Sequence, residues 1–213
     1  MRKLIVLSFI TLDGVMQAPG GPGEDDSGGF KFGGWSVGYF DDFMGNVMTE
    51  QMGHPFDLLL GRKTYDIFAA YWPRLGDDDP TARVINRAKK YVVSHRPVSL
   101  DWKTTIPINS DVAGKIAQLK KEDGPEIQVH GSGNLIQTLL KNDLVDELWL
   151  KTFPVALGSG KRLFAEGTMP AGFTLKASQV SPTGVVASSY GRAGEVKLGS
   201  FELTGSSEEA TRR

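Results

Sequence analysis

Short runs of consecutive apolar residues alternate along the chain with stretches in which apolar residues recur every three or four positions. The runs are rich in β-branched residues, end at turn residues and cover Leu4 to Ile10, Asp57 to Leu60, Tyr91 to Val93 and Ile127 to His130. Runs without polar alternation are typical of strands covered on both faces, as in a mostly parallel sheet. We therefore predict buried strands at these four places.

Helical spacing of apolar residues is found between the runs, at Phe40 to Met52, Val112 to Leu119 and Leu135 to Leu140. Ser110 or Asp111 can cap the second of these helices. A further helix is expected directly after the strand that ends at Leu60. Strands that alternate with helices predict an α/β domain.

The last quarter of the chain has a different pattern. Glu147 to Pro154 predicts another strand, and Phe173 to Val180 with Val185 to Tyr190 predicts a hairpin. We expect this hairpin to add antiparallel strands to one edge of the sheet. The pattern predicts one domain over residues 1–204 and a disordered polar tail over residues 205–213.

A glycine-rich segment over residues 14–38 interrupts these patterns. It contains nine glycines and has no hydrophobic periodicity. A stretch of this length inside a compact domain is either a disordered insertion or a lid over a functional site. Phe30, Phe32 and Trp35 would be unfavourable in a solvated linker, so we favour the lid.

The composition narrows the class of protein. Among 213 residues, 24 are basic and 25 acidic, which gives a net charge of −1 and no general affinity for nucleic acid or anionic lipid. The absence of cysteine excludes disulfides and thiolate chemistry and suits a cytoplasmic protein. The run from Leu4 to Ile10 is too short to span a membrane, and no small-residue cleavage site follows it, so a strand is favoured over a signal peptide.

Three motifs stand at the ends of predicted strands, namely Gly61-Arg62-Lys63-Thr64, Ser94-His95-Arg96 and Gly131-Ser132-Gly133-Asn134. The first and third open helices, and helix N-termini attract phosphate. Each motif is weak alone, because glycine can serve turn geometry and cations can be solvated. The carboxyl ends of parallel strands lie at one edge of a sheet, so the three motifs together predict a phosphate cradle.

Other patterns do not predict a site. Gly158-Ser159-Gly160-Lys161 lacks the remaining residues of a P-loop. The histidines at positions 54, 95 and 130 lack metal-ligand spacing, so no metal is expected. We interpret Asp77-Asp78-Asp79 as a solvated loop.

A succession of short motifs covers residues 1 to about 203. It contains Leu12-Asp13-Gly14, Leu60-Gly61-Arg62-Lys63-Thr64-Tyr65, Val93-Ser94, His130-Gly131-Ser132-Gly133, Asp146-Glu147-Leu148-Trp149 and Pro154-Val155 with Gly160-Lys161-Arg162-Leu163-Phe164. In this order the motifs resemble the dihydrofolate reductase-like superfamily, and most closely the RibD C-terminal domain family of riboflavin-biosynthesis reductases. The resemblance implies a three-layer fold and an NADPH-dependent reductase, often dimeric, with the late hairpin as candidate interface.

The resemblance also implies roles for individual residues. Arg62, Lys63 and Thr64, together with the turn Gly131-Ser132-Gly133, would hold the NADPH phosphates, and Ser94 would lie near the 2′-phosphate. The loop after the first strand would cover nicotinamide and substrate. The substrate would be a pteridine- or pyrimidinedione-like heterocycle of the 5-amino-6-(5-phosphoribosylamino)uracil type.

Two carboxylates are candidate catalytic residues. Dihydrofolate reductases place a carboxylate on the helix after the lid, which the resemblance assigns to Asp41, with Asp42 next to it. Asp13, at the end of the first strand, is the rival. Asp41 can equally be a helix-start carboxylate favoured by the dipole. A non-catalytic nucleotide-binding module of the same fold is the alternative function.

Overall fold

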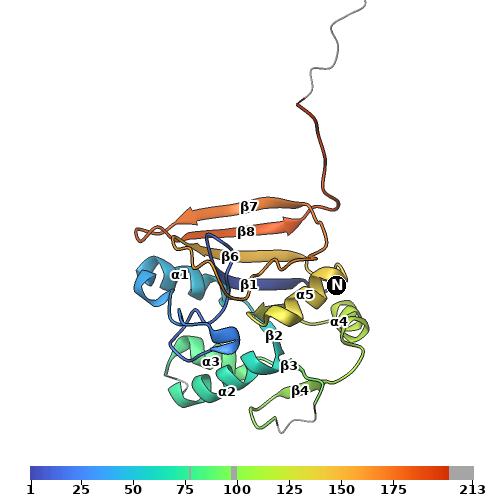
Figure 1. Cartoon of the computed structure of the whole chain (residues 1–213). Coiled ribbons are helices and arrows are strands. Elements are labelled where there is room, and N and C mark those ends of the chain that lie inside the picture. The colour runs from blue at the N-terminus through green and yellow to red at the C-terminus, as the bar shows by residue number, and fades with distance from the viewer. Residues whose placement is uncertain (77, 97–99, 202–213) are drawn as a thin grey trace, which may run out of the picture.

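The computed structural model describes residues 1–76, 78–96 and 100–201, and within these ranges eight strands form one sheet (Figure 1). The strands are β1 (Leu4–Thr11), β2 (Phe56–Gly61), β3 (Lys90–Val93), β4 (Thr105–Ile108), β5 (Glu126–His130), β6 (Glu147–Phe153), β7 (Phe173–Val180) and β8 (Val186–Arg192). The helices are α1 (Asp42–Gln51), α2 (Arg62–Leu75), α3 (Pro80–Arg87), α4 (Val112–Lys121) and α5 (Gly133–Lys141), with 3₁₀ turns η1 (Ser27–Gly29) and η2 (Val37–Tyr39).

The sheet has the order β4-β3-β2-β5-β1-β6-β8-β7. All neighbouring pairs from β4 to β6 are parallel, whereas β8 is antiparallel to both β6 and β7. Figure 1 shows the hairpin of β7 and β8 at one edge and β4 at the other. The α/β class and the mostly parallel sheet with a C-terminal antiparallel hairpin are therefore confirmed.

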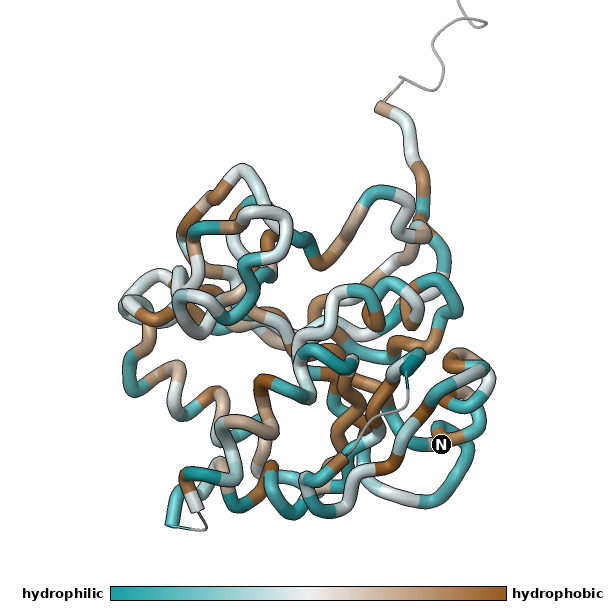
Figure 2. Tube along the Cα trace, turned by 60° about the horizontal axis from the view of Figure 1, so that its bottom comes forward, coloured by the Kyte–Doolittle hydropathy of each residue, from teal (hydrophilic) through white to brown (hydrophobic). Residues whose placement is uncertain are grey.

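Helices cover both faces of the parallel part of the sheet. Apolar side chains of α4 and α5 pack on one face, and those of α1, α2 and α3 pack on the other. In β2, Leu59 belongs to the first cluster, while Leu58 and Leu60 belong to the second, and all three are fully buried. Two covered faces explain why this strand is a continuous apolar run. In Figure 2, hydrophobic stretches run through the interior of the trace and hydrophilic ones lie mostly at its periphery.

Two elements are absent from the sequence-based prediction, β4 and α3. Asp78 is an exposed turn residue, as the interpretation of this stretch as a solvated loop predicts, and Asp79 in addition caps α3 by accepting a hydrogen bond from the Ala82 N–H (2.8 Å). Pro80 occupies the first turn of this helix, a favoured position because its missing N–H needs no partner there. Asp77 lies outside the described residues.

The expected tail of residues 205–213 also lies outside the described residues, as does the predicted domain boundary at residue 204. None of the helices in the described ranges combines the length and hydrophobicity needed to cross a membrane.

Candidate functional site

The first and third predicted motifs contact each other at the carboxyl edge of the sheet. The Gly61 N–H, at the end of β2, donates to Ser132 Oγ (2.9 Å), which follows β5. The Ser132 hydroxyl in turn donates to Thr64 Oγ1 (2.8 Å) in the first turn of α2. The turn after β5 and the start of α2 therefore form one structure, which we call the cradle (Gly61 to Thr64 and Gly131 to Asn134).

Glycine is favoured at two positions of the cradle. Gly131 has φ +61°, a left-handed conformation that is strained for other residues, and Ser132 also adopts it with φ +69°. A Cβ atom on Gly61 would lie 3.2 Å from the Ser132 Cβ, tighter than ordinary contact. A Cβ atom on Gly131 would lie 3.8 Å from Thr64 Oγ1, an ordinary contact distance, so the φ angle rather than crowding favours glycine there.

The two helices that start at the cradle differ from the others in their N-caps. Aspartate side chains accept backbone N–H groups at the starts of α1 (Asp41), α3 (Asp79) and α4 (Asp111). No side chain caps α2 or α5, where Gly61 and Ser132 occupy the N-cap position. First-turn N–H groups have no partner within their helix, so these two helix starts can bind an anion. Asn134, in the first turn of α5, is exposed.

The two cations of the cradle have carboxylate partners in the structure. Arg62 Nε donates to both carboxylate oxygens of Asp66, one turn further along α2 (2.7 and 2.8 Å). Lys63 Nζ is paired with Asp25 of the glycine-rich segment. Both cations keep about half of their side chains exposed and so remain accessible to a ligand.

The second predicted motif lies one strand away, at the end of β3. Its Ser94 hydroxyl donates to the carbonyl of Arg96 (3.0 Å) and accepts from the Arg96 N–H (3.3 Å), which closes a local turn. His95 and the Arg96 side chain are exposed. Because Val93 pairs with Gly61 in the sheet, Ser94 is next to the cradle along this edge. A contact of this motif with a 2′-phosphate stays a prediction.

Asp41 combines a structural bond with an unsatisfied atom. Its Oδ1 accepts the Met44 N–H (2.9 Å) and caps α1, as the dipole argument predicts. Its Oδ2 is buried and has no hydrogen-bond partner among the described residues. A buried acceptor without a partner costs free energy, so this oxygen is suited to receive a donor from a ligand.

Asp13, the rival carboxylate, is fully engaged within the chain. It accepts hydrogen bonds from the Thr11 hydroxyl (2.5 Å) and from the N–H groups of Leu157 (3.2 Å) and Gly158 (2.8 Å). These bonds, the one from Thr11 most of all, lower the pKa of the carboxyl to about 2. Asp13 thus holds the loop after β6 against the end of β1, and this geometry favours Asp41 as the catalytic candidate.

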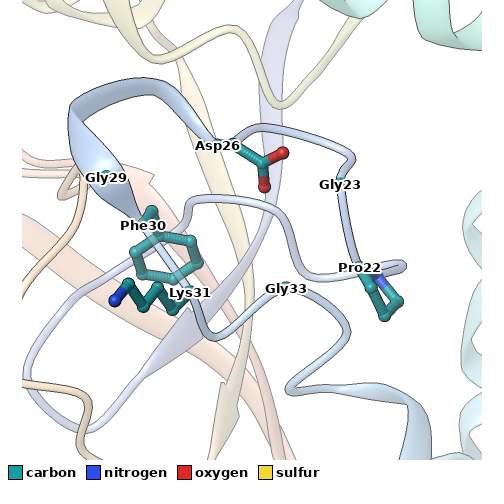
Figure 3. Close-up of a pocket in the computed structure, with 7 residues that line it drawn as sticks. All are labelled: Pro22, Gly23, Asp26, Gly29, Phe30, Lys31 and Gly33. Carbon is teal, nitrogen blue, oxygen red and sulfur yellow. The ribbon is translucent and has the colours of Figure 1, made fainter.

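The glycine-rich segment after β1 packs against the loop after β6. Val15 forms a short antiparallel bridge with Arg162, and Phe30 is buried against Val15 and Ala18. The segment also forms an open hollow of about 450 Å³ (Figure 3), which is lined by Pro22, Gly23, Asp26, Gly29, Phe30, Lys31 and Gly33. None of the predicted site residues lines this hollow. The role of the segment as a lid stays a prediction.

Sequence reasoning missed the contact between this segment and the cradle. Lys63 of α2 and Lys161 of the loop after β6 (2.7 Å) both form ion pairs with Asp25. Gln17 fixes the surrounding backbone, because its side-chain amide donates to the carbonyls of Asp25 and Ser27 (2.9 Å each). The motif around Gly160-Lys161 was the available signal, but nothing in the sequence indicates that it meets Asp25.

A buried polar group also lies beneath α1. Lys151 of β6 donates to the side-chain carbonyl of Gln51 at the end of α1, and burial lowers the pKa of its ammonium to about 7. His130 of β5 contacts the side-chain carbonyl of Gln128 (2.9 Å). Burial, with a further contribution from Lys151, lowers the His130 pKa to about 3. Within the described residues, no group of three or more histidine or carboxylate side chains could hold a metal ion.

Solved structures of low sequence identity share this fold. A putative riboflavin biosynthesis protein from Shewanella sp. PV-4 aligns with a TM-score of 0.61 at 22% identity, over 90% of this chain and 99% of that one. Dihydrofolate reductase from Enterococcus faecalis, solved with NADP(H), aligns with a TM-score of 0.56 at 14% identity, over 89% and 96% of the two chains.

Sequence comparison gives the family. The protein YyaP of Bacillus subtilis (strain 168) is 33% identical over 168 residues, which cover 78% of this chain and 81% of YyaP. YwjB of the same organism is 28% identical over 186 residues, or 84% and 91% of the two chains. The family model of the RibD C-terminal domain matches residues 2–187 and supports a reductase-type function. The chain belongs to the RibD C-terminal domain family.

Proposed function

We propose that this protein is an NADPH-dependent reductase that transfers a hydride to a pteridine- or pyrimidinedione-like heterocycle, of the 5-amino-6-(5-phosphoribosylamino)uracil type. The proposal combines the reductase-type family with two features of the site, the cradle and the start of α1. The cradle would hold the cofactor and the start of α1 the substrate.

The pair of helix starts without side-chain caps is the observation that carries the cofactor assignment. At α1, α3 and α4 an aspartate satisfies a first-turn N–H, whereas at α2 and α5 no side chain does so. Ser132 stands in the N-cap position of α5, yet its hydroxyl bonds across to Gly61 and Thr64. Two adjacent helix N-termini with free N–H groups are suited to the paired phosphates of a dinucleotide.

The residues around these helix starts fit a phosphate-bearing cofactor. Gly131 leaves open the space in front of Thr64, which a Cβ atom would enter. Arg62 uses only Nε for Asp66, so its terminal nitrogens remain free to donate to a phosphate. Ser94, His95 and Arg96 at the next strand end would meet the 2′-phosphate that distinguishes NADPH from NADH.

Asp41 is our candidate for substrate recognition. Its buried Oδ2 would accept an N–H of the heterocycle, while its Oδ1 continues to cap α1. The neighbouring Phe40 is 46% exposed and packs against Phe9 (ring centroids 5.6 Å apart), so an aromatic surface lies beside this carboxylate. Aromatic surfaces favour stacking of planar rings.

The chemistry itself belongs to the cofactor, since NADPH, when bound, supplies the hydride from its nicotinamide ring. The residues of this chain would bind the phosphates, orient the heterocycle through Asp41 and exclude water. We propose that the segment of residues 14–38 serves as the lid for this last purpose.

A thermal-shift comparison of NADPH and NADH, followed by substrate screening, tests the proposal. At a hundredfold excess over its dissociation constant, NADPH should raise the free energy of unfolding by about 2.7 kcal/mol. The NADPH-saturated protein should then oxidise NADPH in the presence of a pteridine or pyrimidinedione. Absence of any NADPH-dependent stabilisation would refute the proposal. Binding without turnover would favour the alternative, a non-catalytic nucleotide-binding module.

A further inference from the structure

Two lysines from different parts of the chain meet at one carboxylate beside the cradle. Lys63 lies in the first turn of α2, and Lys161 follows β6, and both ammonium groups bind Asp25. Asp25 Oδ1 also accepts from the Ser27 N–H (3.0 Å) and the Ser27 hydroxyl (2.5 Å). Asp25 is nearly buried, whereas about half of each lysine side chain is exposed.

This set of donors is also suited to a phosphate. Ammonium, hydroxyl and backbone N–H groups that converge on one point form charge-assisted hydrogen bonds with any oxyanion. Lys63 directly precedes Thr64, which contacts Ser132 in the cradle. A phosphate at this point would therefore be adjacent to the groups that the cradle offers.

Bonds that do not involve the Asp25 carboxylate also hold the loop in place. Gln17 donates to the carbonyls of Asp25 and Ser27 and accepts the Lys161 N–H (2.9 Å) through its side-chain oxygen. The Met16 N–H donates to the Lys161 carbonyl (2.8 Å). These bonds do not depend on the Asp25 side chain, so the loop retains them if that side chain moves away from the two lysines.

The balance of charges around Asp25 implies that a phosphate would replace a carboxylate rather than bind beside it. Glu24, which accepts the Gly20 N–H (2.6 Å), lies close enough to interact with both Asp25 and Lys63. Two lysines and two carboxylates are therefore balanced without a ligand. An incoming phosphate would leave excess negative charge unless one carboxylate moved away.

We propose that Lys63, Lys161 and Ser27 form an anion subsite in which the Asp25 carboxylate holds the place of a ligand phosphate and is displaced when that phosphate binds. The subsite extends the proposed cofactor cradle and rests on the proposed function for the source of the phosphate. That source is either NADPH or a phosphate on the substrate. Lys161 is then a ligand-binding residue, and Asp25 is an internal competitor.

Titration of inorganic pyrophosphate into the whole protein, followed by calorimetry, tests this subsite. Lys161→Gln should weaken binding about threefold to tenfold, because a partly exposed charge-assisted bond is lost. Asp25→Asn removes the competing charge, keeps the shape and should tighten binding about threefold. Lys176→Gln is the matched control, since Lys176 is similarly exposed and pairs with Glu147 (2.6 Å) on the hairpin side of the sheet. Thermal melts without anion establish that each variant is folded.

The Asp25→Asn variant can overturn the proposal. If Asp25 only latched the loop, the substitution would weaken binding or leave it unchanged, and either result overturns the exchange. A Lys161→Gln variant that binds like Lys176→Gln overturns the subsite itself. Lys161→Arg, which keeps the charge, should restore binding and excludes a general folding defect.

Parallel titrations with NADPH identify the source of the phosphate. If Lys161→Gln weakens NADPH binding, the subsite serves the cofactor. If NADPH binding is unchanged but pyrophosphate binds less tightly to the NADPH-saturated variant, the subsite serves a phosphorylated substrate. Binding of pyrophosphate through Lys161 in a protein that never binds NADPH would uphold the subsite and refute the proposed function.

Discussion

At the cradle, the polar side chains that would meet a ligand already have partners within the chain, whereas at the start of α1 one carboxylate oxygen has none among the described residues. Ser132 bonds to Thr64, Arg62 to Asp66 and Lys63 to Asp25. Asp41 Oδ2 is buried without a donor. The named side chains of the cradle are thus satisfied within the chain, and the carboxylate at the α1 start is not.

This difference predicts different energetics on the two sides. A cofactor phosphate that binds these side chains competes with their internal bonds, so each such contact contributes only the difference between the two. A substrate N–H that meets Asp41 relieves an existing cost and adds a charge-assisted bond. Substitutions on the substrate side should therefore have larger effects than those in the cradle.

Asp41→Asn should cause the largest change. Asparagine still caps a helix, so α1 should remain folded, but the carboxylate that would receive the substrate is lost. We expect the activation free energy for the heterocycle to rise by about 2–3 kcal/mol, which lowers kcat/KM roughly 30- to 150-fold. NADPH affinity, measured by calorimetry, should stay unchanged.

Asp79→Asn is the matched control for this substitution. Asp79 caps α3 with the same geometry, accepting the Ala82 N–H at 2.8 Å, but belongs to no predicted site. If both substitutions lowered kcat/KM equally, the effect would come from helix stability, and the substrate role of Asp41 would be abandoned.

Lys151→Met tests the buried charge beneath α1 through the pH dependence of stability. The Lys151 pKa is lowered by burial from 10.5 to about 7 in the folded chain. Between these pH values the unfolded chain binds more protons, so the free energy of unfolding rises with pH across this window. Methionine has a similar volume and no charge, so the variant should lose this rise and be more stable near pH 6.

Urea denaturation from pH 6 to pH 10 measures this effect. Lys90, with a pKa lowered by burial to about 8, contributes a rise of its own that stays in both proteins. The His130 pKa is about 3 in the folded chain against 6.5 for an unperturbed histidine, so its effect on stability falls mostly below pH 6. Parallel stability curves for the variant and the natural protein would mean that Lys151 titrates normally and that α1 covers it less closely than the structure indicates.

The fold could be predicted from the sequence wherever the hydrophobic pattern within a single segment identifies a strand or a helix. The apolar runs of β1 and β2 reflect strands covered by helices on both faces. The edge strand β4 has four residues, one of them proline, and its middle is exposed, so no apolar run marks it. In α3, the capping Asp79 and Pro80 were helix-start signals hidden within an acidic stretch.

The candidate site also contains parts that the sequence predicts and parts that it does not. The cradle motifs are contiguous in sequence and end strands, so the parallel sheet brings them to one edge. The contact of Asp25 with Lys161 spans 136 residues and depends on how an aperiodic loop folds, which no local pattern encodes. Whether a carboxylate is satisfied, as Asp13 is and Asp41 is not, also depends on distant backbone groups such as the Leu157 N–H.

Ser132→Ala tests how far the cradle is stabilised by its own bonds. The Gly61 N–H would lose its acceptor, and Thr64 would lose a donor. We expect the free energy of unfolding to fall by about 1–2 kcal/mol. Ser110→Ala, which removes an exposed hydroxyl, should change it very little. Chemical denaturation compares the two, and equal stabilities would show that the bond network contributes nothing measurable.

Arg62→Ala should have the smallest effect on stability. It tests whether a cofactor phosphate competes with Asp66 for the Arg62 side chain. The pair of Arg62 with Asp66 is exposed on both sides, so its loss should cost less than about 0.5 kcal/mol of stability. The free energy of NADPH binding should weaken by about 1 kcal/mol. The effect is modest because Arg62 already pairs with Asp66 when no phosphate is bound. Asp66→Ala breaks the same ion pair but leaves Arg62 free, so it should leave NADPH affinity unchanged or increase it. If both variants weakened NADPH binding equally, the ion pair itself would be needed to shape the start of α2, and Arg62 would not be a phosphate ligand.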